Sequence, residues 1–446
     1  MARRDEYDLV DHKNLENAHR FLRGPKAVEA LRIIYELHEA GFIAYMAGGC
    51  VRDALLGNPP KDYDVATDAT PDAIRNVFGK RKTLGFGASF GVMAVLPSQG
   101  RRGSSTEPTE VATFRSDGFY SDGRRPDSVH FGDAEHDVQR RDFTINGLFY
   151  DPLADQIIDF VGGVDDLNRG LLRTIGNPVD RFAEDKLRML RAVRFATTMA
   201  FEIDPATQEA IVHHAADITQ VSGERIGAEM RRVLVHANLL QGLSHLQSCG
   251  LDRLVFPEMH SLNWDLLRGM REAAGRLEPS RNSLGAWNVP RSLAAVVSNL
   301  EDPSSVPLSL IDRWKLSNLE VRIADSALSH WQTIATADRQ KWSTVQPILI
   351  DRDIDTIIWL AETRVAVEQL DPGGLERARE ALAWPAEQLN PPPLLNGDDL
   401  RQLGIPGGPG LGRLLKKIRQ AQLNGELRTR EEAEKTVEKS IKTFDP

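Results

Sequence analysis

The chain has 446 residues but only two cysteines, Cys50 and Cys249, which lie far apart in the sequence. Two distant cysteines provide neither a disulfide framework nor the clustered thiolates of a structural zinc site. Apolar runs are short as well, and none approaches the length that a membrane-spanning helix needs. The first residues, Met-Ala-Arg-Arg-Asp-Glu-Tyr-Asp, lack the apolar core of an export signal. These absences predict a cytoplasmic protein without a membrane partner.

A surplus of positive charge is also missing, since the formal net charge is −9. A protein that binds nucleic acid over its whole surface is therefore disfavoured. A local basic groove is not, because electrostatic steering depends on how charge is distributed. Short basic clusters do occur, among them Lys416, Lys417 and Arg419. Their meaning depends on the motifs that accompany them, and the sequence leaves the oligomeric state open.

The hydrophobic pattern changes along the chain, which is long enough for about two to four domains. Before about residue 150, short strand-like runs alternate with helical patterns, whereas from Asp180 onward nearly every pattern is helical. This predicts the α+β class, with a small mixed β-sheet in an N-terminal head and an all-α neck, body and tail. The predicted segments are an extension over 1–25, the head over 26–150, the neck over 151–215, the body over 216–330 and the tail over 331–446.

One stretch near the N-terminus combines two features that suit nucleotide chemistry. A strand-like run leads into Gly48 and Gly49, which permit a tight turn before a helical pattern, and such a turn can hold a phosphate. Asp62 and Asp64 follow two apart in a strand-like segment, so their carboxylates face the same side and can bind a hard cation such as Mg²⁺. Either feature alone is usually structural. Together they predict chemistry on a nucleoside triphosphate.

Two further residues extend this interpretation. Glu110, in a later strand-like segment, can supply a third carboxylate beside the pair, and Arg52 can face the triphosphate. Three carboxylates on neighbouring strands suit a two-metal transfer of a phosphoryl group to a hydroxyl. The sequence has no Gly-x-x-x-x-Gly-Lys-Ser/Thr motif, which disfavours a P-loop ATPase.

Five motifs follow one another between residues 48 and 229. They are Gly48–Asp53 with Asp62-Tyr-Asp64, Arg140–Gly147, Gly162–Gly163 with Leu171–Gly176, Glu184–Phe195 and Glu224–Glu229. In this order they resemble the motifs of the class II tRNA nucleotidyltransferases (CCA-adding enzymes) and the bacterial poly(A) polymerases, within the polymerase β superfamily. The segment 395–407 resembles one near the end of bacterial members, whereas residues 260–390 show little resemblance.

The resemblance implies a chemical role for each matching residue of the first motif. Asp62 and Asp64 would hold two Mg²⁺ ions, with Glu110 assisting as the third carboxylate. The 3′-hydroxyl of an RNA would attack the α-phosphate of a nucleoside triphosphate, and pyrophosphate would leave. The backbone amides of Gly48–Gly49 and the guanidinium of Arg52 would hold the triphosphate.

The resemblance assigns substrate selection to residues further along the chain. Asp142 would accept from a ribose hydroxyl and so favour NTP over dNTP. Of its neighbours Arg140 and Arg141, one would contact nucleotide and the other RNA or a structural acid. Asp185 and Arg188 stand three apart in a helix expected over 183–200, so they would share one helix face and read the base. A carboxylate accepts from the exocyclic amine that cytosine and adenine share, whereas uracil and guanine present a carbonyl there.

The remaining residues of these motifs would support the pocket. Arg191 and Arg194 would continue the stripe of Arg188 and either reach phosphate or shape the pocket. Arg225 and Glu229 of the last motif, together with Glu224, would brace it from behind.

The implied partners are the 3′ end of tRNA, CTP and ATP, with Mg²⁺ as the cofactor. The helical body would grip the tRNA by its shape and phosphates, helped by Lys416, Lys417 and Arg419. Residues 116–132 show no clear period and are expected to form a mobile loop. In this family the loop is tied to the switch to A addition, and its length here resembles the tRNA-directed members.

Several alternatives remain open at the level of sequence. Within the family they are addition of A alone and poly(A) polymerisation. A catalytically inactive RNA-binding protein on the same scaffold is disfavoured by the intact acids Asp62, Asp64, Glu110 and Asp142. A nucleotidyltransferase for small molecules would leave the Glu184–Arg188 motif and the long tail unexplained.

Overall fold

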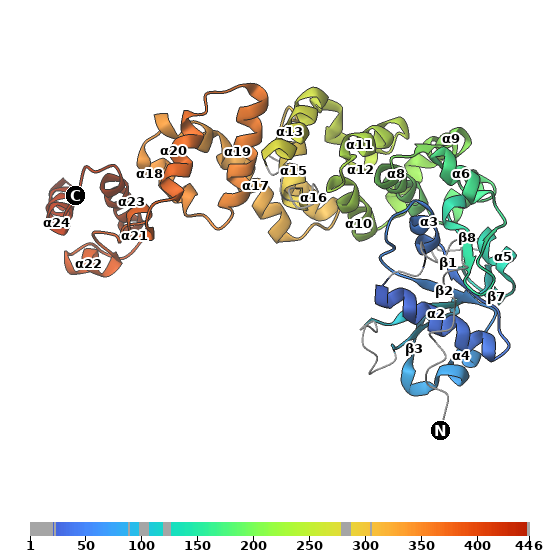
Figure 1. The fold of residues 1–446 in the computed structure, drawn as a ribbon. Coiled ribbons are helices and arrows are strands. Elements are labelled where there is room, and N and C mark those ends of the chain that lie inside the picture. The colour runs from blue at the N-terminus through green and yellow to red at the C-terminus, as the bar shows by residue number, and fades with distance from the viewer. Residues whose placement is uncertain are drawn as a thin grey trace. The chain divides into compact units, whose positions relative to one another are not determined.

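The computed structural model describes residues 21, 24–87, 90–97, 107–118, 126–277, 287–303 and 306–443 (Figure 1). The chain divides into two compact units, 1–233 with 241–256 and 234–240 with 257–446. Within the described ranges, every strand belongs to the first unit, and the second is helical. The α+β class is thereby confirmed. The predicted division into five segments is finer than these two units and stays a prediction.

The first unit is built on a seven-stranded sheet. The strand order is β3 (Thr83–Gly87), β4 (Val92–Val95), β5 (Thr109–Thr113), β2 (Asp64–Thr67), β1 (Ala44–Ala47), β8 (Leu148–Asp151) and β9 (Gln156–Asp159). Neighbours are antiparallel except β2 and β5, which run parallel with Val65 opposite Val111. Asp64 and Glu110, each one residue earlier, therefore stand on adjacent strands at the same end of the sheet.

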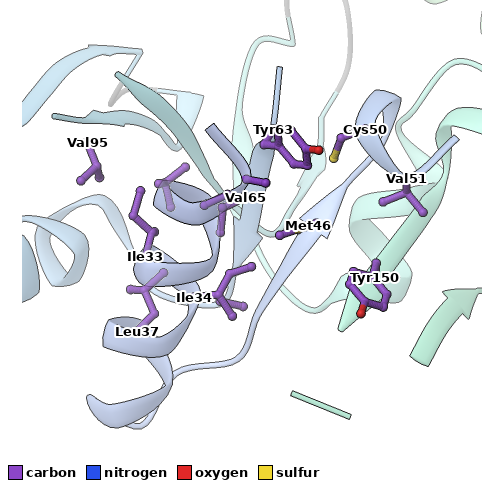
Figure 2. Packing of buried hydrophobic residues seen from close by; sticks show 14 of the residues in the cluster. Ile33, Ile34, Leu37, Met46, Cys50, Val51, Tyr63, Val65, Val95 and Tyr150 are labelled. Atoms are coloured by element: carbon purple, nitrogen blue, oxygen red, sulfur yellow. The ribbon is translucent and has the colours of Figure 1, made fainter. Parts of the chain in front are cut away.

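A helix packs on this sheet and closes its core. α2 (Gly24–Glu39) directs Ile33 and Ile34 toward Met46 of β1 and Val65 of β2 (Figure 2), and these four side chains are fully buried. Each buried aliphatic side chain contributes roughly 1.5–3 kcal/mol through the hydrophobic effect. This core therefore holds β1, which leads into the glycine turn, and β2, which carries Asp64, in a rigid arrangement.

The other elements up to residue 255 follow in chain order. They are α3 (Gly49–Leu55), α4 (Pro71–Phe78), η2 (Lys80–Lys82), β6 (Arg115–Asp117), β7 (Val129–Phe131), α5 (Ala134–Gln139), η4 (Thr144–Asn146), α6 (Gly163–Arg169), β10 (Leu171–Leu172), α7 (Pro178–Glu184), α8 (Leu187–Met199), β11 (Glu202–Ile203), α9 (Pro205–His214), η5 (Ala215–Gln220), α10 (Gly223–Leu234), α11 (Leu239–Ser248) and α12 (Asp252–Val255).

The single helix expected over 183–200 is in fact two helices, so that expectation is wrong. α7 ends at Glu184 and α8 begins at Leu187, with Asp185 between them in an extended backbone (φ −139°, ψ 105°). Asp185 Oδ1 accepts the backbone N–H of Leu187 at 3.0 Å. Short acidic side chains compete in this way with helical hydrogen bonds, which explains the break. Asp185 and Arg188 therefore do not share a helix face.

The segment 116–132 is more regular at its ends than its sequence predicts. β6 and β7 pair antiparallel there, with Ser116 opposite His130. Three-residue strands are too short to show a period of two, so no signal was available. Residues 119–125 of the expected loop lie outside the described residues.

The second unit contains only helices among its described residues. They are η6 (Pro257–Ser261), α13 (Trp264–Leu277), α15 (Val289–Val297), α16 (Val306–Arg313), α17 (Asn318–Ala335), η7 (Ala337–Arg339), α18 (Trp342–Leu349), α19 (Ile354–Glu368), α20 (Gly373–Leu382), α21 (Ala386–Leu389), α22 (Gly397–Gln402), α23 (Pro409–Leu423) and α24 (Arg430–Thr443). Residues 395–437 bury a small core of their own, which includes Leu400, Ile418 and Val437. In the part of the chain that the structure describes, no helix has the length and apolarity needed to cross a membrane.

Gly163 marks a close approach that supports the neighbouring turn. A Cβ atom at this position would lie 2.2 Å from the backbone oxygen of Thr144, the first residue of η4. We expect Gly163→Ala to displace η4 and to lower the free energy of unfolding by about 1–3 kcal/mol. Gly275→Ala in α13, where a Cβ atom meets nothing within 4 Å, should instead be neutral or slightly stabilising. Thermal denaturation compares the two variants, and equal melting temperatures would contradict this account.

Candidate active site

A polar cavity of about 730 Å³ opens in the first unit between the sheet, the turn η4 and helix α8. All predicted catalytic and nucleotide-binding residues except Arg194 line it. The lining residues are Ala47, Gly48, Gly49, Arg52, Asp62, Asp64, Val65, Ala66, Val92, Glu110, Ala112, Arg140, Arg141, Asp142, Asn146, Asp185, Arg188, Arg191, Phe195 and Arg232. The fold thus joins motifs that are more than a hundred residues apart in the sequence.

The acids at the sheet end of the cavity repel one another. Asp64 keeps access to solvent, but the cavity walls reduce its hydration and Glu110 lies on the adjacent strand. Loss of hydration, followed by repulsion from Glu110 and Asp62, raises the pKa of Asp64 to about 6. Carboxylate oxygens are the ligands that a hard divalent cation prefers, and such a cation would neutralise this excess negative charge. The acids therefore fit a metal.

Asp62 does not join the other two acids in a preformed metal centre. Its carboxylate is 74% exposed and lies 2.7 Å from the ammonium of Lys26, which also contacts Glu107 at 2.7 Å. Among the described residues, no three acidic, histidine or cysteine side chains converge closely enough to hold a metal. Lys26 is thus the counter-ion of Asp62, a pairing that no sequence pattern indicates.

The glycine turn is required by its backbone and by its surroundings. Gly48 has φ +69°, and a Cβ atom there would lie 3.0 Å from Nη1 of Arg141. Gly49 begins α3, which carries Arg52 into the cavity wall. The guanidinium of Arg52 donates to Asp53 Oδ1 at 2.6 and 2.9 Å and to Asn146 Oδ1. Arg52 is therefore oriented before any substrate binds.

A buried acid holds the two adjacent arginines of the second motif. Asp137 on α5 is 1% exposed, and its two carboxylate oxygens lie 2.7 Å from Arg140 and 2.9 Å from Arg141. Burial by itself would raise the pKa of Asp137, but the two guanidinium groups hold it below its usual range. Sequence reasoning missed Asp137, although its spacing of three and four residues before the arginines is a helical signal.

Asp142 is buried and its carboxylate is fully engaged. Oδ2 accepts from Nε and Nη2 of Arg191 at 2.9 and 2.5 Å. Oδ1 accepts from the side-chain amide of Asn146 and from the backbone N–H of Phe143, both at 2.9 Å. Burial opposes ionisation, but the Arg191 guanidinium and the Asn146 amide lower the pKa of Asp142 to about 2. Asp142 is therefore a fixed anion in the cavity wall.

Asp185 and Arg188 both line the cavity, but their side chains form no ion pair with each other among the described contacts. Asp185 Oδ2 accepts from Arg225 at 2.8 Å. This contact agrees with the predicted role of Arg225 in bracing the pocket, which stays a prediction. Arg188 donates to Glu184 at 2.6 Å and to the backbone oxygens of Arg181 and Arg140, both at 3.1 Å. Each side chain is thus held by a different partner, at the place where α7 gives way to α8.

Arg194 lies outside the cavity lining. It is 8% exposed, its Nε donates to Glu229, and its guanidinium carbon stands 3.6 Å from the ring centre of Phe195. Burial is the first cause of its lowered pKa. This placement corresponds to the shaping of the pocket that was one of its two expected roles, with Glu229 behind it as predicted.

Comparison with known proteins agrees with this geometry. The family described as "Poly A polymerase head domain" matches residues 44–173, and "Probable RNA and SrmB- binding site of polymerase A" matches residues 200–263. A CCA-adding enzyme of Geobacillus stearothermophilus is 32% identical over 414 residues, which are 92% of this chain and 95% of that protein. The chain belongs to the family of CCA-adding enzymes. These enzymes are nucleotidyltransferases, a class that generally uses a divalent metal.

Other relatives separate the two branches of the resemblance. A CCA-adding enzyme of Enterococcus faecalis is 31% identical over 91% of this chain and 93% of its own length. Poly(A) polymerase I of Salmonella typhi is 38% identical, but only over 54% of this chain and 52% of that protein. Similarity to CCA-adding enzymes therefore extends over nearly the whole chain, whereas the poly(A) polymerase matches about half of it.

Solved structures extend the similarity to three dimensions. The crystal structure of the Bacillus stearothermophilus CCA-adding enzyme in complex with CTP has a TM-score of 0.66 and 29% identity, and covers 94% of this chain and 99% of that one. The Thermotoga maritima CCA-adding enzyme complexed with tRNA has a TM-score of 0.61 at 21% identity, over 95% and 98% of the two chains. The second likeness shows a common fold.

The predicted RNA-binding cluster of this CCA-adding family member is split by the structure. Lys416 and Lys417 on α23 are exposed, as an RNA contact requires. Arg419 instead donates to the backbone oxygen of Pro391 at 2.7 Å and to Asn390 Oδ1 at 2.8 Å. It therefore holds the proline-rich segment at 390–393 in place, and its role as an RNA contact is not supported by this geometry.

The raised pKa of Asp64 has a consequence for the metal-free protein. The neutral carboxyl contributes stability that is complete below the ordinary pKa of 3.8 and is lost as the pH rises through about 6. We therefore expect Asp64→Asn to raise the melting temperature in EDTA by roughly 2 °C at pH 8 and by about half as much at pH 5, which lies between the two pKa values. Scanning calorimetry of both proteins at the two pH values provides the measurement. A lower melting temperature for the variant at pH 8 would contradict the repulsion.

Lys26 should compete with a metal for Asp62. Removal of its ammonium by Lys26→Met is expected to lower the dissociation constant for Mg²⁺ by about threefold, the size of an exposed ion pair. Titration calorimetry with Mg²⁺ measures this in the absence of nucleotide. Lys61→Met is the matched control, because it removes the same charge beside Asp62 but makes no ion pair among the described residues. If both variants changed the dissociation constant equally, the effect would come from the loss of one positive charge and not from the Lys26–Asp62 ion pair.

Proposed function

We propose that this protein adds C, C and A to the 3′ end of tRNA, using CTP and ATP as donors and no nucleic-acid template. One observation carries the proposal: the cavity places the acids of β2 and β5 together with Asp185 and Arg188, in a chain that matches CCA-adding enzymes over nine-tenths of its length. The first group suits nucleotidyl transfer, and the second suits a choice between bases.

The acids would serve the transfer step. Asp62 and Asp64 would hold Mg²⁺, with Glu110 as the third carboxylate, and release of Asp62 from Lys26 would complete this donor set. When bound there, Mg²⁺ lowers the pKa of an attacking hydroxyl and neutralises charge on the phosphates. Asp64 and Glu110 reside on rigid strands, which supports a fixed geometry for in-line attack of the tRNA 3′-hydroxyl on the α-phosphate.

The nucleotide would be held by groups that are already oriented. The backbone amides of Gly48–Gly49 and the guanidinium of Arg52 would bind the triphosphate. Arg141, fixed by Asp137, would add positive charge beside them. Each carboxylate oxygen of Asp142 already accepts two hydrogen bonds, so Asp142 would accept from a ribose hydroxyl in place of one of its present donors.

The base would be read where α7 ends. Asp185 would accept from the exocyclic amine of cytosine or adenine, and Arg188 would donate to a ring nitrogen or carbonyl of the same base. Arg225 holds the Asp185 side chain and Glu184 holds the Arg188 side chain. This supports recognition of the base by groups that are oriented before it binds. Uracil and guanine would meet a carboxylate with a carbonyl oxygen and be rejected. Arg191 would stay with Asp142 and shape the pocket.

The tRNA would be bound by the helical unit as well as by the cavity. Lys416 and Lys417 would contact its phosphates, with Arg419 supporting them from the 390–393 segment. The substrate and the absence of a membrane-crossing helix among the described residues support a cytoplasmic location. Addition of A alone and poly(A) synthesis are the alternatives. Poly(A) synthesis has less support than CCA addition, because the poly(A) polymerase matches only about half of the chain.

Three tRNA substrates decide among these activities. The protein is incubated with tRNA lacking CCA, tRNA ending in C and tRNA ending in CC, with CTP and ATP separately and together. CCA addition predicts that all three are extended to the same end, and that UTP and GTP are not used. Extension of only the CC-ended tRNA would mean addition of A alone, and a long tail from ATP on unrelated RNA would mean poly(A) synthesis.

Asp62→Ala tests the metal assignment in the same assay. We expect at least a thousandfold loss of extension, because loss of one metal ligand disables both charge neutralisation and activation of the hydroxyl. Asp72→Ala, an exposed aspartate on α4 of the same unit, is the control and should retain the wild-type rate. Extension by Asp62→Ala at a rate near that of the control would overturn the assignment.

A further inference from the structure

Asn146 is a cavity residue to which sequence reasoning gave no role. It ends the short turn η4 and is 8% exposed. Its Oδ1 accepts from Arg52 and its Nδ2 donates to Asp142 Oδ1 at 2.9 Å. Its backbone oxygen accepts from Arg141 at 3.3 Å. One residue therefore contacts three of the side chains that the proposed function assigns to the nucleotide.

The chemistry of these partners permits only one orientation of the amide. A guanidinium carries donors alone and an ionised carboxylate carries acceptors alone. The amide oxygen of Asn146 must therefore face Arg52, and the amide nitrogen must face Asp142. The amide satisfies both at once with two different atoms, its oxygen as acceptor and its nitrogen as donor. Neither Asp nor a hydrophobic residue of similar size can do so.

A second route joins the same two residues on the other side. The guanidinium carbons of Arg52 and Arg191 lie 5.2 and 5.3 Å from the ring centre of Phe195. Arg191 in turn forms the ion pair with Asp142 at 2.5 Å. The contacts thus close a ring that runs from Asn146 through Arg52, Phe195, Arg191 and Asp142 and back to Asn146. All five members line the cavity.

We propose that Asn146 is a positioning residue that couples the grip on the triphosphate by Arg52 to the reading of the ribose by Asp142. The inference rests on the proposed function, which supplies the roles of those two residues. When a ribose hydroxyl bonds Asp142, the amide transmits the fixed position of that carboxylate to Arg52. Without the amide, Arg52 keeps only Asp53 and the ring of Phe195, and its position no longer depends on the ribose.

A binding cycle tests this coupling without tRNA. Dissociation constants for ATP and dATP are measured by titration calorimetry for the wild type, Arg52→Lys, Asn146→Ala and the double variant. When Asn146 is present, Arg52→Lys should raise the dissociation constant for ATP about tenfold more than that for dATP. This difference is the size of one charge-assisted hydrogen bond. In the Asn146→Ala background, the substitution should weaken both nucleotides equally. The same tenfold difference in both backgrounds would overturn the inference.

Two further variants separate positioning from folding. Asn146→Asp keeps an acceptor for Arg52 but opposes a second carboxylate to Asp142, so it should weaken ATP at least as much as Asn146→Ala. Asn299→Ala removes an equally buried amide from the second unit, where it donates to the Ala295 backbone oxygen. It should lower the melting temperature without changing the ratio of ATP to dATP affinity. A changed ratio in this control would mean that the effect is one of general stability.

The cycle also keeps the two proposals distinguishable. A wild type that binds ATP but extends no tRNA would contradict the proposed function, while the cycle would still report whether Asn146 couples the two residues. A wild type that extends tRNA but shows equal Arg52→Lys penalties for ATP and dATP would overturn the coupling alone.

Discussion

Parallel pairing of β2 with β5 is the constraint on which the site depends. It places Asp64 and Glu110 on adjacent strands, in a sheet whose other neighbours are all antiparallel. Burial, followed by repulsion between like charges at this spacing, destabilises the ionised carboxylate of Asp64 and raises its pKa. The buried core beneath, with α2 packed on β1 and β2, supplies the stability that lets the strands keep this arrangement. A bound divalent cation would relieve the same repulsion that opposes folding.

Away from the acids of the sheet, several arginine side chains lie in or behind the cavity wall, and each is held in one orientation. Buried acids hold the guanidinium groups: Asp137 binds Arg140 and Arg141, Asp142 binds Arg191, and Glu229 binds Arg194. A buried pair gives little net stability, because both charges lose their hydration. Its benefit here is geometric, since an arginine held before the substrate arrives loses less conformational entropy on binding. These arginines are thus held in place by acids of the protein itself.

Particular residues mark the limits of what the sequence could predict. The sequence motif identifies Asp185 and Arg188, but the prediction that they share a helix face is wrong. The backbone N–H of Leu187 donates to the carboxylate of Asp185, and this local hydrogen bond breaks the helix. The sequence places Arg419 in a basic surface cluster, but in the structure its guanidinium donates to the backbone oxygen of Pro391, nearly thirty residues earlier. Lys26 and Asn146 gave no signal, since each gains its significance only from partners far away in the chain.

By itself, the sequence determined the α+β class, the helical second half, the acidic pair, the glycine turn and the family, because strand and helix periods and short motifs are local patterns. Only the tertiary structure decided which groups share the cavity, that Asp62 is paired with Lys26, and that Asp142 is joined to Arg52 through Asn146 and to Arg191. Such contacts join residues up to about fifty to a hundred positions apart. No local pattern records them, since they arise when the strands pair and α8 packs beside the turn η4.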